Sequence, residues 1–383
     1  MELLRERGPL SRQEIASLSG LSQATVNRLT ADLARERAIV PDTQGPSSGG
    51  RPPLLYRYNG QAKGVVALDV GGTKTAGAVA DLTGALIHRE VRPTFAEGDT
   101  HDVAAATLER TLSFAADLVR QALRAGAPPR AVAIGVPGVV HPERGEVEWA
   151  PAIQWRHLPL ARLATERLGI ETIVENDVNL MAFGEHRRGV GRGTHHMIGL
   201  ALGTGVGAGL ILDGHLYRGW NDAAGEVGYL LVERSSLERA YPGFGDLESR
   251  IGGRGIGLRA HERGMRGPAD GAVTAADVFA AARSGDAAAT DLVSEIADEF
   301  ALAVGGLAAM LAPELIVIGG GIGRSADLLI PRLRERLVGR VPHVPRIEPA
   351  ALGDDATLIG AAELAIEASA GYSYVTSRGR LTR

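Results

Sequence analysis

The spacing of apolar residues changes near residue 60, and the part of the chain before this point has a helical period. In "SRQEIASLSGLSQATVNRLTADLARERAIV" (residues 11–40), Ser11 and Glu14 have the spacing of a capping box, which predicts the start of a helix. The apolar residues Ile15 and Leu18 of this helix are expected to point inward. Gly20 is expected to end the helix in a tight turn.

A second helix is predicted directly after this turn. Ser22 is a suitable N-cap, and Val26, Leu29 and Leu33 repeat at the spacing of one helix face. Two short helices joined by a glycine turn are typical of a helix-turn-helix motif. The next segment, "PSSGGRPPLLYRYNG", has a Gly/Pro-rich tip followed by a short strand pattern, as expected for the wing of a winged helix.

Polar residues at the start of the second helix form a candidate DNA-binding face. Such side chains can bond to base edges or phosphates when the helix lies in the major groove, and Arg51 on the wing tip can enter a minor groove. The predicted face consists of Ser22, Gln23, Thr25, Asn27 and Arg28. The net charge of residues 1–60 is only +2, from eight arginines against six acidic residues, so a small helical oligomerisation module is the alternative.

After residue 60, apolar strands end repeatedly at glycine-rich loops. "GVVALDVGGTKTAGAVAD" predicts a buried strand, a glycine turn and a second apolar strand, and "IGLALGTGVGAGLILDG" repeats this format more than a hundred residues later. The repetition predicts two related lobes that face each other across a cleft. A third segment, "PELIVIGGGIG", predicts a strand that runs into a loop suited to close packing against an adenosine.

The expected organisation is an α/β protein of several segments. The length of 383 residues agrees with two or three domains. We predict a winged helix-turn-helix DNA-binding domain in residues 1–60, a first lobe in 61–178, a second lobe in 179–370 and a flexible tail in 371–383.

Composition excludes several classes of protein. Hydrophobic residues make up 45% of the chain and charged residues 22%, which is typical of globular proteins, and a net charge of −4 requires any basic patch to be local. The chain has no cysteine, no apolar leader and no apolar run of about 18 residues. These absences exclude disulfides, thiolate metal sites and membrane spans, and we expect a soluble, cytoplasmic protein without a membrane partner.

The glycine loops are candidate phosphate-binding sites. The Walker spacing is absent, because Lys74 follows only two glycines and no helix is expected after it. Glycines let backbone N–H groups approach a phosphate, a threonine adds a hydroxyl, and Asp69 can hold a hydrated Mg²⁺. The predicted ATP- and Mg²⁺-binding residues are Asp69, Gly71, Gly72, Thr73, Lys74, Gly203, Thr204, Gly205, Gly319, Gly320 and Gly321.

Asn176 and Asp177 follow a short strand and open a helix in "IVENDVNLMAFGEHRRG". In a phosphoryl transfer, the Asp177 carboxylate could accept the proton of the attacking hydroxyl. The alternative is that both residues are ordinary helix N-caps. Together with Glu226 and Glu248 they offer the carboxylate and amide groups that suit a sugar, and Gly138 ends a Pro-Gly turn that is expected to line the same cleft.

Six motifs, in this order behind a winged helix, resemble the ROK family of repressors, open reading frames and sugar kinases. They are "LDVGGTKT", "GVPG", "END", "LGTGVGAG", "AGEVGY" and "GGGI". The resemblance implies a two-lobed, actin-like ATPase (ribonuclease H-like) sugar-kinase fold. It also implies Asp177 as catalytic base, Asn176, Glu226 and Glu248 as sugar ligands, and the glycine runs as phosphate and adenosine loops.

The chain departs from the family pattern at a metal site. The pattern has a histidine where Tyr229 stands, and cysteines where Arg239, Tyr241 and Asp246 stand, which together bind a structural Zn²⁺. The residues present cannot form a thiolate–imidazole site. We therefore expect no structural zinc and a loop held by packing and hydrogen bonds, with Tyr241 and Phe244 as plugs.

The same departures affect the sugar site. The family's histidine also contacts the sugar, so Tyr229 is a candidate sugar-binding residue of altered specificity, and Ala152 stands where many relatives have an asparagine. These two changes predict an atypical sugar site. The histidines His186, His195 and His196 do not have zinc-ligand spacing and are expected at the surface.

The sequence is compatible with two functions, and it identifies neither the sugar nor the operator. The favoured one is a transcriptional regulator, a repressor of carbohydrate genes, that binds double-stranded operator DNA as a homodimer or higher homo-oligomer and senses a sugar effector with its kinase-like body. The alternative is an ATP-dependent sugar kinase of the glucokinase or N-acylhexosamine kinase type. The glycine loops leave binding of ATP with Mg²⁺ open, whereas the N-terminal domain favours the regulator.

Overall fold

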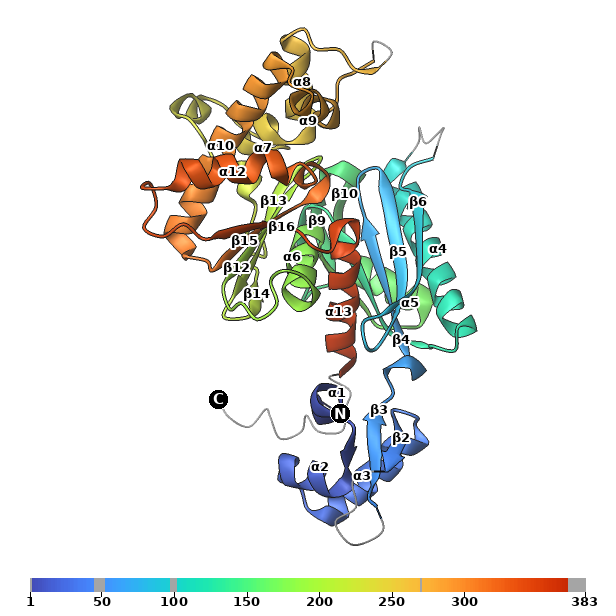
Figure 1. Ribbon diagram of the computed structural model, residues 1–383. Helices are drawn as coiled ribbons and strands as arrows, with labels where there is room; N and C mark the ends of the chain where they lie inside the picture. The colour runs from blue at the N-terminus through green and yellow to red at the C-terminus, as the bar shows by residue number, and fades with distance from the viewer. Residues whose placement is uncertain (1, 45–51, 97–101, 269–270, 371–383) are drawn as a thin grey trace.

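The computed structural model shows an N-terminal domain followed by a body with two lobes (Figure 1). The residues that it describes are 2–44, 52–96, 102–268 and 271–370. Arg51 and the predicted tail 371–383 lie outside the described residues. Within the described ranges, no helix is long and apolar enough to cross a membrane.

The N-terminal domain is a winged helix, as the sequence predicts. Ser11 and Glu14 form the capping box, Gly20 ends the first predicted helix with φ of 67°, and Ser22 caps the second. A short helix that the sequence analysis did not predict comes before them. The elements are α1 (Glu2–Arg7), β1 (Leu10–Ser11), α2 (Arg12–Ser19), α3 (Gln23–Arg35), β2 (Ile39–Gln44), β3 (Leu54–Tyr58) and the 3₁₀ turn η1 (Gly60–Ala62). The strands have the order β1-β3-β2.

The core of this domain is small. Leu4, Leu10, Ile39 and Tyr56 are buried together, and Ile15 packs against them. The prediction that Leu18 also points inward is wrong: its side chain is 45% exposed. A domain of this size has few interior positions, and the last turn of α2 is left outside them.

Each lobe contains a five-stranded sheet, and the two sheets share one topology. Their strand orders are β11-β7-β4-β5-β6 and β14-β13-β12-β15-β16. In both sheets an antiparallel hairpin comes first, and two later strands then add in parallel beside its first strand. This duplication confirms the two related lobes predicted from the repeated strand–glycine–strand pattern, and it is the architecture expected of the actin-like fold.

The first lobe combines its main sheet with a small antiparallel sheet in the order β10-β9-β8. Its strands are β4 (Gly64–Val70), β5 (Lys74–Asp81), β6 (Leu86–Pro93), β7 (Pro129–Val136), β8 (Val139–His141), β9 (Glu146–Ala150), β10 (Trp155–Leu158) and β11 (Thr172–Asn176). Its helices are α4 (Val103–Arg124), α5 (Leu160–Leu168) and the 3₁₀ turn η2 (Pro151–Ile153). Alternate residues of β4 pack on α4 and on the C-terminal helix, so the strand is apolar on both faces.

The second lobe carries most of the remaining helices (Figure 1). Its strands are β12 (Met197–Leu202), β13 (Val206–Leu212), β14 (His215–Tyr217), β15 (Leu315–Gly319) and β16 (Arg346–Pro349). Its helices and 3₁₀ turns are η3 (Val227–Tyr229), η4 (Arg234–Glu238), α7 (Asp246–Ile251), α8 (Gly253–Glu262), α9 (Ala275–Arg283), α10 (Ala287–Leu311), α11 (Gly320–Gly323) and α12 (Ala326–Leu337). Residues of α10 and α12 pack on one face of the sheet in the largest apolar cluster of the chain's described part.

Two helices lie between the sheets. Helix α6 (Asp177–Arg188) follows the last strand of the first sheet and packs on the second through Ala182 and Phe183. Helix α13 (Ala356–Ala370), after the 3₁₀ turn η6 (Gly353–Asp355), packs on the first sheet through Leu358 and its neighbours. The chain therefore returns to the first sheet at its end, and α6 and α13 join the two lobes.

Candidate functional site

The end of β11 and the start of α6 bring predicted residues together. The side-chain oxygen of Asn176 accepts hydrogen bonds from the backbone N–H groups of Val178 and Asn179, both at 2.9 Å. Its amide nitrogen donates to the carbonyl oxygen of Gly138 at 2.9 Å. The side chain of Asn176 therefore acts as the N-cap of α6 and holds the Gly138 turn beside it.

Asp177 occupies the first position of α6. One of its carboxylate oxygens accepts a hydrogen bond from the backbone N–H of Val178 at 2.9 Å. Burial raises the pKa of Asp177 to about 6, although this backbone hydrogen bond acts in the opposite direction. A carboxyl group with a pKa near neutrality can both take up and release a proton, which is the property that a general base requires.

Other predicted carboxyl groups lie close enough to Asp177 to feel its charge. Burial raises the pKa of Asp69 to about 7, the charge of Asp177 adds to this increase, and Lys74 opposes it. Burial also raises the pKa of Glu226 to about 7, and the charges of Asp177 and Glu248 contribute. The structure thus brings together acidic residues from both lobes. Carboxylates accept hydrogen bonds, so this group of acidic residues suits a ligand whose hydroxyl groups donate hydrogen bonds.

Glu248 and Tyr229 have structural contacts of their own. A carboxylate oxygen of Glu248 accepts a hydrogen bond from the backbone N–H of Val206 at 2.8 Å, next to the second glycine loop. The hydroxyl of Tyr229 donates to the carbonyl oxygen of Gly243 at 3.0 Å. Burial raises the pKa of Tyr229, and the charges of Glu226 and Glu248 raise it further. Tyr229 therefore lies beside the acidic group while it fastens the following loop.

Asp246 is the centre of a hydrogen-bond network in the loop between Val232 and Arg250, where the sequence predicts that no structural zinc is bound. One carboxylate oxygen accepts hydrogen bonds from the Ser236 hydroxyl at 2.6 Å and the backbone N–H of Val232 at 3.0 Å. The other accepts from the Tyr241 hydroxyl at 2.9 Å and from Arg250 Nε at 3.0 Å. Although burial acts in the opposite direction, these donors lower the pKa of Asp246 to about 2.

The residues at the family's cysteine positions thus take different roles. Asp246 and Tyr241 are bonded to each other, so hydrogen bonds do hold the loop. The prediction that Phe244 plugs the loop is wrong, since its side chain is 43% exposed. Among the described residues, no group of three or more histidine, aspartate or glutamate side chains is arranged to hold a metal ion.

The three predicted glycine loops lie near one another, either directly or through residues that follow them in the chain. A Cβ added to Gly203 would come within 3.8 Å of the backbone nitrogen of Gly321, so the second and third loops are adjacent. Lys74, which follows the first loop, lies 3.8 Å from Asp354, and Asp354 forms two 2.7 Å hydrogen bonds with Arg324. The ion pairs of Asp354 therefore join the first lobe to the end of the third loop.

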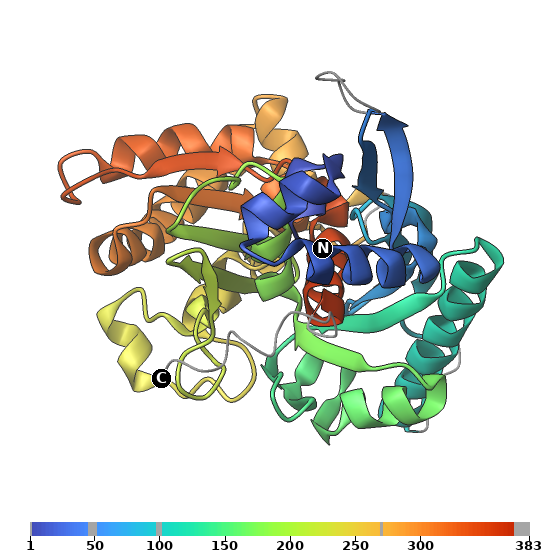
Figure 2. The same cartoon turned by 90° about the horizontal axis from the view of Figure 1, so that it is seen from below.

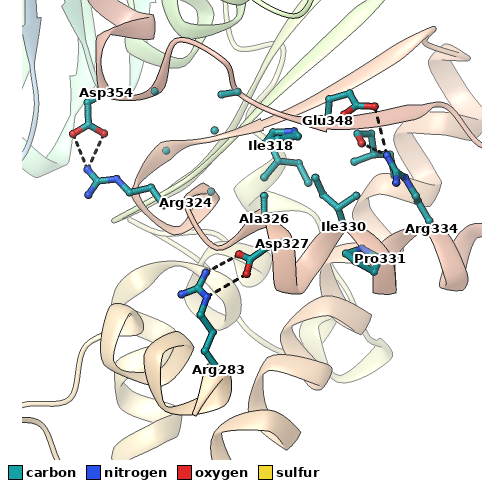
Figure 3. Close-up of a pocket in the computed structure, with 17 residues that line it drawn as sticks. Arg283, Ile318, Arg324, Ala326, Asp327, Ile330, Pro331, Arg334, Glu348 and Asp354 are labelled. Carbon is teal, nitrogen blue, oxygen red and sulfur yellow. Dashed lines mark hydrogen bonds and ion pairs between the residues drawn. The ribbon is translucent and has the colours of Figure 1, made fainter. Parts of the chain in front are cut away.

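A pocket of about 770 Å³ opens at the ends of β15 and β16 (Figure 3). Gly319 and Gly320, two of the predicted adenosine-loop residues, line it. Ion pairs between Arg283 and Asp327 and between Arg324 and Asp354 stand at its edge (Figure 3). None of the four residues of the acidic group, Asp69, Asp177, Glu226 and Glu248, lines this pocket, so the acidic group and the pocket are separate features.

The predicted DNA-binding face lies on the first turns of α3. Gln23, Asn27 and Arg28 are exposed. The amide nitrogen of Gln23 donates to the side-chain oxygen of Asn27 at 3.2 Å, and the Ser22 hydroxyl lies 2.8 Å from that of Thr25. The N-terminal domain is at the end of the molecule next to the C-terminal end of α13, away from the helices of the second lobe (Figures 1 and 2).

One contact between the lobes was not predicted from the sequence. His141 on β8 lies 2.8 Å from Asp222, in the loop after β14, and 2.6 Å from Glu148 on β9. Hydrogen bonds to Asp222 and Glu148 raise the pKa of His141, although burial and Arg144 oppose this. Its partner in the second lobe is 81 residues away, so no local signal in the sequence could have indicated the pair.

A buried carboxylate behind Asp177 was also missed. Glu175 is 1% exposed and accepts hydrogen bonds from Asn176 N–H, from the Asn179 amide and from Arg218. Glu175 thereby holds the first turn of α6 through its hydrogen bonds with Asn176 and Asn179. The expectation that His186 lies at the surface is wrong, because this residue is buried within α6 and its Nε2 is 2.9 Å from the carbonyl oxygen of Thr194.

Comparison with family models identifies both parts of the chain. The model of the ROK family matches residues 65–368. The model of the IclR helix-turn-helix domain matches residues 1–43, which contain α1, α2 and α3.

Individual relatives match these two parts differently. The xylose repressor of Caldicellulosiruptor bescii is 26% identical to this chain over 93% of the chain and 92% of the repressor. A solved ROK family transcriptional regulator, described as a homolog of the E. coli MLC protein, shares the fold with a TM-score of 0.80 at 23% identity over 96% of this chain and 94% of its own. A solved ROK family glucokinase from Streptomyces griseus, in complex with glucose and AMPPNP, is 30% identical with a TM-score of 0.68, but 99% of it corresponds to only 79% of this chain.

Proposed function

The chain belongs to the ROK family, and from that premise we propose that it is a DNA-binding repressor of carbohydrate genes whose kinase-like body senses a sugar. One observation carries this proposal: a winged helix precedes the two lobes in the chain. The glucokinase, matched over 99% of its length, corresponds to only 79% of this chain, whereas the xylose repressor, matched over 92% of its length, corresponds to 93% of it.

The proposed DNA contact is the exposed start of α3. A homodimer would present two such helices to a two-fold operator, with Gln23, Asn27 and Arg28 toward bases and phosphates in the major groove. Arg51, which lies outside the described residues, is expected from the sequence on the wing tip and would there reach a minor groove or a phosphate. This function places the protein in the cytoplasm, where the chromosome lies.

The proposed effector site is the acidic group around Asp177. Sugar hydroxyls would donate hydrogen bonds to Asp177, Glu226 and Glu248, and the ligand would be held between residues of both lobes. Asn176 and Tyr229 already bond to Gly138 and Gly243, so their contribution to sugar binding is to shape the site. A ligand held in this way changes DNA binding only through a difference in its affinity for two arrangements of the lobes.

The second candidate is an ATP-dependent sugar kinase, and the glucokinase similarity favours it. The residues fit a nucleotide in part: both loops are rich in glycine, although the N–H groups of Gly71 and Gly203 donate to the carbonyl oxygens of Lys74 and Gly205 within their own hairpins. Asp69 would hold the Mg²⁺ that neutralises phosphate charge. Lys74, however, already lies near Asp354. Asp177 would accept the proton of the sugar hydroxyl as its pKa of about 6 permits.

The test begins with a thermal-shift screen of aldopentoses and aldohexoses, D-xylose and D-glucose first, with and without Mg-ATP. A duplex selected by the protein from random DNA then serves as operator in a gel-shift titration with each sugar that binds. Loss of operator affinity on sugar binding supports the repressor. Sugar phosphorylation that disappears in Asp177→Ala, without any effect of sugar on DNA binding, supports the kinase instead.

A further inference from the structure

Helices α6 and α13 cross with their backbones in contact. A Cβ added to Gly184 of α6 would overlap the carbonyl oxygen of Ala356, and one added to Gly360 of α13 would overlap the carbonyl oxygen of Leu180. Because α6 packs on the second sheet and α13 on the first, this crossing is also a contact between the lobes.

The candidate effector site lies on one side of the crossing. Asp177 is at the first position of α6, and the hydroxyl of Thr357 on α13 donates to its carbonyl oxygen at 3.4 Å. At about 1.5 Å of rise per residue, Asp177 is about 10 Å before Gly184 along the helix axis, and Arg188 is about 6 Å after it. A rotation of α6 about the crossing therefore moves Asp177 and Arg188 in opposite directions.

An ionic cluster lies on the other side of the crossing. Arg188 Nε donates to a carboxylate oxygen of Glu363 on α13 at 2.7 Å, and its guanidinium donates to the carbonyl oxygen of Thr83 at 2.6 Å. The other carboxylate oxygen of Glu363 is 3.7 Å from Arg5 in α1 of the winged domain. Glu363 is only 4% exposed, and among the described residues Arg188 and Arg5 are the two arginines that contact its carboxylate.

The same cluster touches the connection between the domains. Thr83 belongs to the turn between β5 and β6, where the backbone N–H of Leu82 donates to the carbonyl oxygen of Gly60 in η1. Arg188 thus contacts the turn that holds the interdomain connection, and through Glu363 it also reaches α1. Figure 1 shows α1 below the end of α13, and in the perpendicular view of Figure 2 the N-terminus again overlies α13.

We propose that Arg188, Glu363 and Arg5 form the coupling contact through which a sugar at Asp177 controls the winged domain. Sugar binding shifts the N-terminal end of α6, the rotation about Gly184 moves Arg188 against Glu363, and the contact of Glu363 with Arg5 is released. The winged domain then loses its fixed position for operator binding. Glu363 is a positioning residue in this scheme, and the inference rests on the proposed repressor function.

The test compares the wild type with Arg5→Ala and Glu363→Gln. Arg5 is 38% exposed in its side chain, so its removal leaves the fold intact even if the variant of the buried Glu363 fails to fold. Glu367→Gln is the matched control, because Glu367 pairs with Arg187 on the same two helices but makes no contact with Arg5 among the described residues. The readout is operator affinity by gel shift, without and with a saturating amount of the aldose from the thermal-shift screen.

The expected result is that both variants bind the operator, without sugar, as weakly as the sugar-bound wild type does, and that sugar no longer changes this affinity. Their sugar affinity, measured by calorimetry, stays at or above that of the wild type, whereas Glu367→Gln behaves as the wild type. If Arg5→Ala retains the wild-type ratio of affinities with and without sugar, the coupling contact is wrong. If the wild type itself shows no sugar effect on DNA binding, the proposed function fails instead.

Discussion

The hydroxyl of Tyr241 donates a hydrogen bond to the carboxylate of Asp246 at 2.9 Å, five residues further along the chain. Both residues stand at positions where the resemblance to the family leads us to expect cysteines. Asp246 also accepts hydrogen bonds from Ser236, Val232 and Arg250. One buried carboxylate thus accepts hydrogen bonds from four donors and ties together the segments on which they lie.

The first prediction concerns the stability of this loop against acid. The folded-state pKa of Asp246, about 2, lies below its ordinary value of 3.8, so the ionised group stabilises the fold above pH 4. This contribution, about 2 kcal/mol, is lost as the pH falls from 4 to 2. Urea unfolding at pH 6 and pH 3 should show the loss in the wild type. Asp246→Asn should be less stable at pH 6 and should lack this part of the pH dependence.

The control for this prediction is Glu233→Gln. Glu233 also pairs with Arg250, but its side chain is half exposed, and exposed pairs contribute little. We expect its unfolding free energy to change little. An Asp246→Asn protein as stable as Glu233→Gln at pH 6 would show that packing, and not the carboxylate, holds the loop.

The second prediction concerns the acidic group at the candidate effector site. The pKa of Glu226, about 7, lies above its ordinary value of 4.5, so the folded state binds the proton more tightly than the unfolded state. Stability from this group is therefore present below pH 4.5 and is lost as the pH rises through 7. Glu226→Gln should raise the melting temperature at pH 8 and leave it nearly unchanged at pH 5, because the neutral amide resembles the protonated acid.

The same variant tests ligand binding. The side-chain oxygen of a glutamine at position 226 can accept a hydrogen bond from a sugar hydroxyl but carries no charge, so sugar affinity at pH 8 should fall about tenfold or more. Calorimetry with the sugar found by thermal shift measures this loss. If Glu226→Gln is stabilised at pH 8 and still binds the sugar as the wild type does, Glu226 belongs to the acidic group but is not a ligand.

The third prediction concerns the DNA-binding face of α3. Removing Arg28, which is exposed on this face, should cost about 1–3 kcal/mol of operator affinity and, if it meets a phosphate, should reduce the salt slope by about one. Gel-shift titrations of Arg28→Ala at several salt concentrations measure both quantities. Arg35→Ala is the matched control, because Arg35 ends the same helix and pairs with Asp32. Equal losses in both variants would indicate a general effect of positive charge.

The sequence predicted features that depend on neighbours in the chain. The capping box of Ser11 and Glu14, the left-handed Gly20 and the cap at Ser22 all involve residues within about four positions, and each is found. Apolar strands joined by glycine turns, repeated along the chain, likewise predicted both lobes. The N-cap at Asn176 is likewise a local feature, because its side chain accepts hydrogen bonds from Val178 and Asn179, two and three residues later.

Other features depend on partners far apart in the chain, and the sequence carries no signal for them. Arg188 meets Glu363 across 175 positions, and Glu175 meets Arg218 across 43. His186 is buried because α6 lies between the two sheets. The sequence does not indicate this, because the neighbouring Arg187 and Arg188 are typical of an exposed segment. The wrong expectations for Leu18 and Phe244 have the same origin, because an apolar residue packs only where a tertiary surface is available to cover it.

The fourth prediction concerns nucleotide binding. Asp354 pairs with Arg324 through two 2.7 Å hydrogen bonds and lies 3.8 Å from Lys74, the cation next to the first glycine loop. Its pKa is lowered chiefly by Arg324, and Lys74 contributes, so the carboxylate is ionised at neutral pH. A triphosphate that uses Lys74 must compete with this carboxylate. Asp354→Asn should therefore bind Mg-ATP several-fold more tightly than the wild type, and Lys74→Ala should bind it more weakly.

Calorimetric titration with Mg-ATP measures both effects. Asp355→Asn is the matched control, because Asp355 is adjacent in the chain but pairs with Arg89 at the edge of the first sheet. Removing its charge should change ATP affinity much less, since the effect of a charge falls with distance and with screening by salt. If Asp354→Asn and Lys74→Ala both bind Mg-ATP as the wild type does, Lys74 does not contact phosphate. The first glycine loop would then serve only as a hairpin turn between β4 and β5.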